Sequence, residues 1–298
     1  MQSNRNEEKE NRMEKMPLNN KTPIYAGIVL YNPDILRLTE NINAIYPQVD
    51  GLIIVDNKSE NLMDIKTLLK KYKNIILITN NDNLGIAKAL NQIMEVGLNN
   101  HIDWILTLDQ DSVVSKSLIY YYRKYIDVPN VGMMTCLLKD RNAKGIADKF
   151  KDANDDYEEV EKCITSACLT NVTAWDSCGR FDEKMFIDYV DYDLCMTFRE
   201  NGYRIIRVNQ TSVLHELGNS KDVRFFTRKY VVSNHSSKRK YFFIRNRLYY
   251  NKKHSKILNL KEEYKGMFVY IVLTLLYEPN KFSNFKAMVR GALDSRKM

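Results

Sequence analysis

Residues 104–112 read Trp-Ile-Leu-Thr-Leu-Asp-Gln-Asp-Ser, an apolar run that stops at two carboxylates. Such a run predicts a fully buried strand of a parallel sheet. Ligands of open α/β sheets bind outside the carboxyl ends of these strands, which is where Asp109 and Asp111 fall. Acids at positions i and i+2 of an extended chain point to the same side. A solvated turn can also carry this tripeptide, but its position after a buried strand favours a site for Mg²⁺ and a substrate diphosphate.

Strand and helix patterns alternate through the first half of the chain. Apolar runs predict further strands over residues 24–30, 51–55, 74–79 and 131–138. Amphipathic spacing predicts helices over residues 34–46, 65–72, 84–98 and 115–126. This alternation requires an α/β fold with a mostly parallel central sheet, right-handed crossovers and flanking helices.

Polar residues follow three of the predicted strands, and we expect these strand tips to share one edge of the sheet. They are Tyr31 and Asn32, Asp56 and Asn57, and Asp109 and Asp111. No G-x-G-x-x-G follows the first strand, which disfavours a dinucleotide fold, and the absence of G-x-x-x-x-G-K-[ST] excludes a P-loop. The tips therefore predict a nucleotide cleft of another kind.

The second half is less regular. Residues 140–162 are charged and aperiodic, which predicts a mobile surface loop near the cleft. We expect strands over 163–171, 203–208 and 213–215, and helices that begin at Trp175 and over 190–201.

Three acids, Asp188, Asp191 and Asp193, stand at the start of the 190–201 helix. Helix N-termini favour carboxylates, which alone accounts for all three. An ionised carboxylate in a cleft is also what a general base must be. His215 follows an apolar pair; a lone His is more often structural than a ligand, although imidazole beside two carboxylates is acceptable to Mg²⁺ or Mn²⁺.

Positive charge is concentrated at the C-terminal end. Residues 221–298 hold 19 Lys and Arg against five Asp and Glu, whereas residues 1–220 hold 26 Lys and Arg against 32 Asp and Glu. Such a basic, aromatic-rich extension can be a merely solvated surface, but it favours an anionic partner: a membrane surface, a nucleic acid or a phosphate-bearing substrate. Within it, residues 267–277 are apolar, too short for the ~20 residues that cross a bilayer but suited to an interfacial helix.

The N-terminal end and the cysteines complete the division of the chain. Residues 1–20 are polar without an apolar core, which predicts a disordered tail and excludes a secretory signal. The five cysteines form no C-x-x-C pair, so we expect reduced, mostly buried thiols and no zinc site. We expect a tail over 1–20, a catalytic domain over 21–220 and a basic helical extension over 221–298.

Four blocks of sequence together resemble glycosyltransferase family 2, and specifically its bacterial rhamnosyltransferase branch. They span residues 24 to about 250: Leu-Tyr-Asn-Pro-Asp (30–34), Ile-Val-Asp-Asn-Lys-Ser (54–59), Asn-Leu-Gly-Ile-Ala-Lys-Ala-Leu-Asn (83–91) with Leu-Thr-Leu-Asp-Gln-Asp-Ser (106–112), and Phe-Ile-Asp-Tyr-Val-Asp (186–191) leading to Leu-His-Glu-Leu-Gly (214–218). The resemblance implies a GT-A fold and an inverting, metal-dependent transfer of a sugar from a nucleotide donor.

The resemblance also implies roles for single residues. Asp109 and Asp111 look like the metal motif that holds the donor diphosphate, with Mg²⁺ or Mn²⁺ as cofactor, and His215 looks like a further metal ligand. Asp191 matches the catalytic base; Val190 stands where many relatives have Glu, as is usual in the rhamnosyl branch, so Asp188 and Asp193 stay rivals. The implied donor-binding residues are Tyr31, Asn32, Asp56, Asn57, Asn83 and Asp109.

The implied donor is dTDP-β-L-rhamnose, and the implied acceptor is a lipid-linked saccharide at the inner, cytoplasmic face of the cell membrane. The same fold would also serve UDP-galactofuranose, UDP-glucose or another UDP-hexose. A nucleotidyltransferase would need a Gly-rich, Arg-containing loop after the first strand, which residues 26–29 do not provide. A nucleic-acid-binding protein would leave Asp109, Asp111 and Asp191 without a role and would show a steep salt dependence on DNA or RNA.

Overall fold

The structure is a computed structural model that describes residues 22–140, 155–215, 221–225 and 227–298. The tail expected over 1–20, and most of the loop expected over 140–162, lie outside these residues. Of the cysteine thiols, only that of Cys178 is part-exposed; the other thiols are buried, and all are free, as the sequence predicted.

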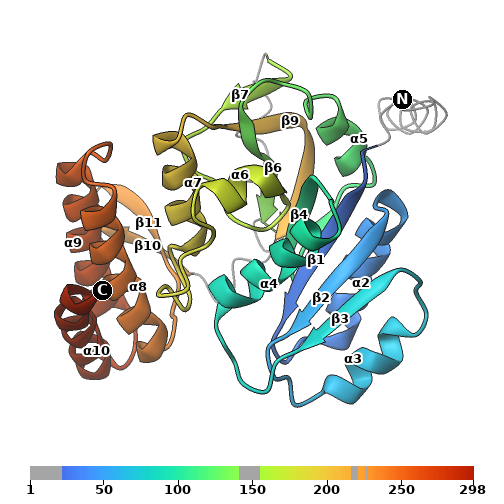
Figure 1. Cartoon of the computed structure of the whole chain (residues 1–298). Coiled ribbons are helices and arrows are strands. Elements are labelled where there is room, and N and C mark those ends of the chain that lie inside the picture. Colours follow the sequence, from blue (N-terminus) through green and yellow to red (C-terminus); the bar gives the residue numbers. More distant parts are fainter. Residues whose placement is uncertain (1–21, 141–154, 216–220, 226) are drawn as a thin grey trace, which may run out of the picture.

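Four parallel strands form the half of the sheet that the sequence predicted. They stand in the order β3-β2-β1-β4 (Figure 1). Their bounds are Ile24–Leu30 for β1, Gly51–Asp56 for β2, Ile75–Thr79 for β3 and Trp104–Asp109 for β4. Every residue of β2 is buried, as expected for a strand covered on both faces. The mostly parallel α/β architecture is therefore confirmed.

The remaining strands extend the sheet beyond β4 with mixed directions. They are β5 (Val113–Val114), β6 (Val131–Asp140), β7 (Tyr157–Glu159), β8 (Cys168–Asn171) and β9 (Arg204–His215). β8 runs antiparallel between β4 and β6, and β9 runs parallel to β6. The two strands expected over 203–208 and 213–215 are one strand, whose register against β6 shifts between Cys136 and Leu137. β7, inside the segment expected to be a loop, pairs with β9.

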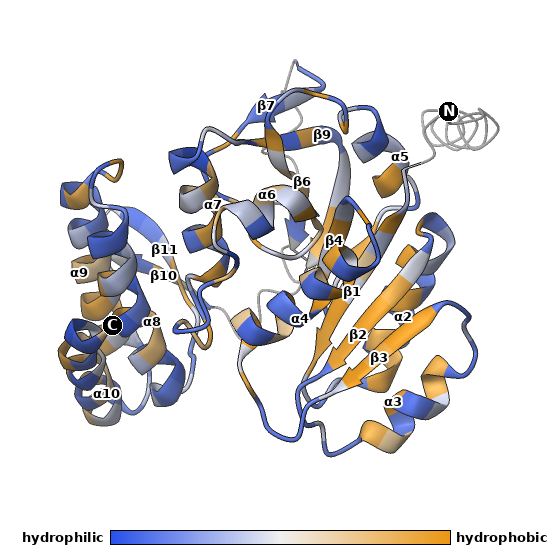
Figure 2. Cartoon of the chain, viewed as in Figure 1, coloured by the Kyte–Doolittle hydropathy of each residue, from blue (hydrophilic) through white to orange (hydrophobic). Residues whose placement is uncertain are grey.

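Helices cover both faces of the sheet and enclose two apolar clusters. One face carries α2 (Ile35–Ile45), which continues into the short 3-10 helix η1 (Tyr46–Gln48), α3 (Leu62–Leu69) and α5 (Leu118–Arg123). The other carries α4 (Ile86–Asn99), α6 (Val172–Ser177) and α7 (Val190–Glu200). Leu52 and Ile54 of β2 join the first cluster, and Ile53 and Val55 the second. Figure 2 shows the apolar strands between these layers.

Local sequence signals fix where several of these helices begin. The Asp34 carboxylate accepts hydrogen bonds from the backbone N–H groups of Leu36 and Arg37, which caps α2. Asn171 caps α6 in the same way through the N–H of Ala174. α5 is shorter than the predicted 115–126 helix, because residues on both sides of it form turns.

The C-terminal extension is helical, as predicted, but a hairpin precedes the helices. Strands β10 (Lys221–Phe225) and β11 (Arg228–Val232) pair antiparallel. Then follow α8 (Ser237–Lys253), α9 (Leu260–Tyr277), α10 (Lys281–Asp294) and the short 3-10 helix η3 (Ser295–Lys297), which form a separate layer beside α7 (Figure 1). Among the described helices, none is both long and apolar enough to cross a bilayer.

Candidate active site

The strand register brings the predicted polar tips to one edge of the sheet. Leu30 of β1 pairs with Asp56 of β2, and Val29 pairs with Asp109 of β4. From β1 the strand order continues to β2 and β3 on one side and passes to β4 on the other. This reversal is a topological switch point, where open α/β sheets bind their ligands.

The loop after β1 is tied to the neighbouring strand tips. The Tyr31 backbone N–H donates to Gln110 Oε1 at 3.0 Å, and the Tyr31 side chain is half-exposed. Asn32 has a φ of 48°, in the left-handed region. Its Oδ1 accepts from the Glu60 N–H at 2.7 Å, so its amide supports the loop after β2.

Asp56 is fully buried at the end of β2, and its two carboxylate oxygens differ. Oδ2 accepts from the Ser59 N–H at 3.1 Å. Oδ1 is also buried, and among the described residues it has no hydrogen-bond partner. A buried acceptor without a donor costs about 1–3 kcal/mol. Asp56 Oδ1 is therefore a buried acceptor that an additional N–H donor would satisfy.

Asn57 and Asn83 shape the next loop by contacts within the protein. Asn57 Nδ2 donates to the Gly85 carbonyl at 3.1 Å, and Asn57 Oδ1 accepts from Asn80 Nδ2 at 2.9 Å. Asn83 Oδ1 accepts from the Gly85 N–H at 3.0 Å. Gly85 is required because its φ is 86° and a Cβ there would lie 2.6 Å from the Phe186 carbonyl oxygen. These two amides thus fix the backbone between β3 and the start of α4.

Asp109 and Asp111 are half-buried in a fixed turn after β4. The Asp109 carbonyl accepts from Asn41 Nδ2 at 2.6 Å and from the Ser112 N–H at 3.2 Å. His215 ends β9; its neighbour Leu214 pairs with Val113, which brings that backbone beside the same turn, while the His215 side chain lies outside the described residues. Within the described part of the chain, no three His, Cys, Asp or Glu side chains form a group that would hold a metal.

The three acids near the start of α7 have different environments. Asp188 is paired with Arg239 of α8, with Nη2 to Oδ1 at 3.0 Å. Asp193 is fully buried, with Oδ2 at 2.7 Å from Lys253 Nζ and Oδ1 at 2.9 Å from His254 Nε2. The described contact of the Asp191 carboxylate is with the N–H of Tyr192, at 2.9 Å. Two of the three acids are therefore occupied by cations of α8.

Asp191 is also the acid with a strongly perturbed proton affinity. Burial, with the negative charges of Asp109 and Asp188 adding to it, raises the pKa of Asp191 to about 7. The contribution from Asp109 places Asp191 within electrostatic range of the turn that follows β4. A carboxylate that exchanges its proton near neutral pH is suited to general acid–base chemistry.

Helix α8 also holds the backbone that leads to Asp191. Asp188 and Tyr189 are consecutive residues in the left-handed region, with φ of 68° and 69°. The fully buried Asn246 donates from Nδ2 to the carbonyls of Ile187 and Asp188, at 2.8 and 3.0 Å. Sequence reasoning missed Arg239 and Asn246, because only the packing of α8 reveals their contacts with residues so distant along the chain.

Comparisons with known proteins agree with this geometry. The model of the family described as Glycosyl transferase family 2 matches residues 25–170. The dTDP-rhamnosyl transferase RfbF of Shigella flexneri is 26% identical over 284 residues, which cover 91% of this chain and 94% of that protein. The poly-beta-1,6-N-acetyl-D-glucosamine synthase of Staphylococcus aureus is 27% identical over 120 residues, 40% of this chain and 28% of the synthase.

Two solved structures have a similar fold at low sequence identity. S. aureus TarS 1-349, in complex with UDP-GlcNAc, superposes with a TM-score of 0.57 at 13% identity, covering 92% of this chain and 80% of that one. GalNAc-T7, solved with UDP, GalNAc and Mn²⁺, gives a TM-score of 0.58 at 10% identity. The matched region is 79% of this chain and about half, 48%, of GalNAc-T7.

Proposed function

This chain belongs to glycosyltransferase family 2 and has the GT-A fold, and we propose that it transfers L-rhamnose from dTDP-rhamnose to a lipid-linked polysaccharide precursor. The donor assignment is supported by the likeness to RfbF, which extends over 91% of the chain. The observation that carries the proposed mechanism is that Asp191, unlike Asp188 and Asp193, presents a carboxylate that α8 does not occupy.

In the proposed complex, Asp56 reads the base of the nucleotide. Thymine and uracil both carry a ring N–H between two carbonyls, and the buried Oδ1 of Asp56 is an acceptor that this donor would satisfy. Tyr31 and Asn32 border the same position from β1, and the loop fixed by Asn57 and Asn83 borders it from β3. This arrangement supports a pyrimidine nucleotide.

The proposed metal site is built from Asp109 and Asp111, with His215 as a third ligand. Two carboxylates at a strand tip, together with substrate phosphates, match the oxygen ligands that Mg²⁺ and Mn²⁺ take. The pairing of Leu214 with Val113 supports His215, because it brings the end of β9 next to this turn. When bound, the cation would offset the charge that develops on the leaving diphosphate.

We assign the general base to Asp191. Its carboxylate takes the proton of the acceptor hydroxyl as that oxygen attacks the anomeric carbon from the face opposite the nucleotide, which inverts the configuration at that carbon. The pKa of about 7 supports this role because the carboxylate is both substantially ionised and basic enough at neutral pH. Asp188 and Asp193 instead anchor α8.

A second donor class is supported by the structural neighbours. TarS 1-349 was solved with UDP-GlcNAc, and Asp56 would accept from uracil as readily as from thymine. The alternative is therefore the same fold and mechanism with UDP-galactofuranose, UDP-glucose or another UDP-hexose as donor.

The C-terminal helices supply the proposed membrane contact. Residues 221–298 carry 19 Lys and Arg against five Asp and Glu, and large apolar side chains of α9 and α10, such as Phe268 and Phe282, are exposed. Basic charge beside exposed apolar side chains is typical of proteins that lie on anionic bilayers. We therefore place the protein at the inner, cytoplasmic face of the cell membrane, where a lipid-linked acceptor is found.

The donor assignment is tested by incubating the full-length protein with dTDP-rhamnose, UDP-galactofuranose, UDP-glucose and UDP-GlcNAc in the presence of Mg²⁺ or Mn²⁺. Donor hydrolysis is followed by release of the nucleoside diphosphate. We expect the fastest hydrolysis with dTDP-rhamnose and none with a chelator. Faster hydrolysis of a UDP-hexose would transfer the assignment to the second donor class.

A further inference from the structure

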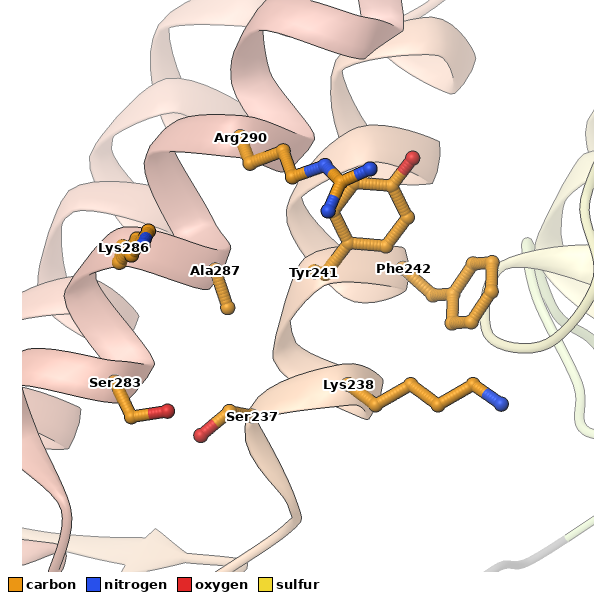
Figure 3. Close-up of a pocket in the computed structure, with 8 residues that line it drawn as sticks. All are labelled: Ser237, Lys238, Tyr241, Phe242, Ser283, Lys286, Ala287 and Arg290. Atoms are coloured by element: carbon orange, nitrogen blue, oxygen red, sulfur yellow. The ribbon is translucent and has the colours of Figure 1, made fainter.

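A groove of about 430 Å³ lies between the N-terminal part of α8 and the neighbouring helix α10 (Figure 3). Its lining residues are Ser237, Lys238, Tyr241 and Phe242 of α8 and Ser283, Lys286, Ala287 and Arg290 of α10. The hydroxyls of Ser237 and Ser283 face one another across it. The groove has fixed walls, because a Cβ on Gly291 would collide with the Tyr241 carbonyl oxygen and the two helices therefore cross in close contact.

The lining is positively charged and contains no acid. Among the described residues, neither Lys238 nor Lys286 has a carboxylate within ion-pair distance. Arg290 lies over the Tyr241 ring at 5.8 Å from its centroid, and its Nε is 3.7 Å from the Asp294 carboxylate; the side chain of Arg290 is 78% exposed and that of Asp294 21%. Because the Arg290 side chain is largely exposed, this ion pair contributes little. Lys238 extends along the rim, with its Nζ 5.9 Å from the centroid of the Phe186 ring. The Ser237 hydroxyl donates to Asn284 Oδ1 at 2.7 Å. The groove therefore presents to an anion the cations of Lys286 and Arg290 and the Ser283 hydroxyl, with Lys238 at its rim.

The solvent-facing side of α10, next to the groove, is apolar. Phe282, Phe285, Val289 and Leu293 are 82%, 49%, 43% and 55% exposed. Their spacing of three and four residues places them on one face of the helix, and the groove-lining Lys286 and Arg290 adjoin that face. A ligand in the groove therefore has an apolar surface beside its anionic group, which favours a lipid phosphate over a free anion.

The groove also adjoins the loop that leads to the base. Phe242, on the groove wall, stacks on Phe186, with ring centroids 5.1 Å apart and planes 19° apart. The Phe186 carbonyl accepts from the Ile86 N–H at 2.7 Å, at the start of α4. Phe242 and Phe186 thus connect the groove wall to the start of α4, next to the loop that Asn57 and Asn83 fix.

We propose that the groove between α8 and α10 binds the phosphate or diphosphate group that joins the acceptor saccharide to its lipid, with the lipid chain beside the apolar face of α10. The inference rests on the proposed function, since it names the subsite for the acceptor of that reaction. Lys286 and Arg290 would donate charge-assisted hydrogen bonds to the phosphate oxygens, and Lys238 at the rim would add positive charge.

The test uses the full-length protein and farnesyl diphosphate, a soluble lipid diphosphate, with inorganic pyrophosphate and farnesol as comparisons. Binding is measured by titration calorimetry for the wild type and for the double variant Lys286→Ala/Arg290→Ala. The matched control is Lys252→Ala/Lys256→Ala, which removes two exposed lysines from the other end of α8 and its following turn. Donor hydrolysis with dTDP-rhamnose and metal is measured in parallel on every variant.

We expect farnesyl diphosphate to bind at least tenfold more weakly to the groove variant, about equally to the control, and more tightly than pyrophosphate or farnesol to the wild type. Equal binding by wild type and groove variant, or equal loss in both variants, would overturn the proposal. So would pyrophosphate that binds as tightly as farnesyl diphosphate. If the wild type does not hydrolyse dTDP-rhamnose, the proposed function fails at its donor. That result is independent of the binding measurements, which test the groove.

Discussion

The guanidinium of Arg239 holds the carboxylate of Asp188 through two nitrogens, with Nη2 at 3.0 Å and Nε at 3.2 Å from Oδ1. The pair joins the loop before α7 to the first turn of α8. It fixes one residue of a left-handed pair only three residues before Asp191. The carboxylate of Asp188 is therefore a structural anchor, and the position of Asp191 depends on the C-terminal helices.

Replacement of Asp191 by Asn should lower turnover by about 10²–10⁴-fold, the usual contribution of a general base. Affinity for the donor should be retained, because the amide is nearly isosteric with the carboxylate. Steady-state kinetics and donor titration of Asp191→Asn are to be compared with the same measurements on Asp188→Asn and Asp193→Asn. Near-normal turnover of Asp191→Asn, with one of the other two inactive, would show that the base is misassigned.

The same substitution should stabilise the protein at neutral pH. The folded-state pKa of Asp191 is about 7, whereas an ordinary Asp has 3.8. The stability conferred by its protonation is present below about pH 4 and is lost as the pH rises through 7. Asp191→Asn should therefore unfold with a free energy about 1–3 kcal/mol above that of the wild type at pH 8. Denaturant titrations should show this difference shrink between pH 7 and pH 4; a difference independent of pH would contradict the shifted pKa.

Asp111→Ala should abolish metal-stimulated donor hydrolysis and leave the free energy of unfolding nearly unchanged, because the side chain is only half-buried at a strand tip. Asp103→Ala is the matched control, since Asp103 is an exposed acid just before the opposite end of the same strand. We expect the control to hydrolyse the donor at the wild-type rate. If Asp111→Ala still hydrolyses the donor in the presence of a chelator, the assignment of Asp111 as a metal ligand is wrong.

Asn246→Leu should lower both stability and turnover. It leaves the carbonyls of Ile187 and Asp188 without their donor, at an expected cost of about 1–3 kcal/mol. Asn251→Leu on the same helix is the matched control, because Asn251 is equally buried and, among the described residues, neither its Oδ1 nor its Nδ2 has a partner. Chemical denaturation and steady-state kinetics should show a larger loss of unfolding free energy and of turnover for Asn246→Leu than for Asn251→Leu. Equal losses in the two variants would refute a specific role of Asn246.

Binding of the full-length protein to vesicles with phosphatidylglycerol should fall as salt is added, because the attraction of surface charges is screened. Phe282→Ser/Phe285→Ser should weaken binding severalfold by removing exposed apolar surface from α10. Leu36→Ser/Met63→Ser is the control, since both side chains are exposed on the sheet domain. Vesicle binding is measured by flotation. If the two double variants bind vesicles equally well, the apolar surface of α10 is not the membrane contact.

The sequence was most informative where burial alone decides structure. The run from Gly51 to Asp56 is buried throughout. A short apolar run of this kind seldom forms anything other than a central strand. The strand ends at Asp56 and Asp109 could also be predicted to lie at one edge of the sheet, because the carboxyl ends of parallel strands meet there. These positions follow from local pattern and topology.

Features that depend on distant contacts were not predictable. The strands β10 and β11 are rich in charged residues and contain no long apolar run. Their hairpin was therefore not predicted from the sequence. Asp193 looked like any acid at a helix N-terminus, yet it is buried against His254, about 60 residues later in the chain. Choosing among the three acids needed the partners of each, which only the packing of α8 on α7 provides.

Helix α8 has a consequence for how such proteins diversify. Its residues contact the loop over 184–188 and also form one wall of the basic groove. A recombinant that exchanged the C-terminal helices with those of a relative, but kept its own loop, would mismatch Arg239 with Asp188 and Asn246 with its two carbonyls. Residues 182–253 should therefore be inherited and transplanted as one block, and engineering a new acceptor preference by grafting helices alone would uncouple the catalytic carboxylate from its support.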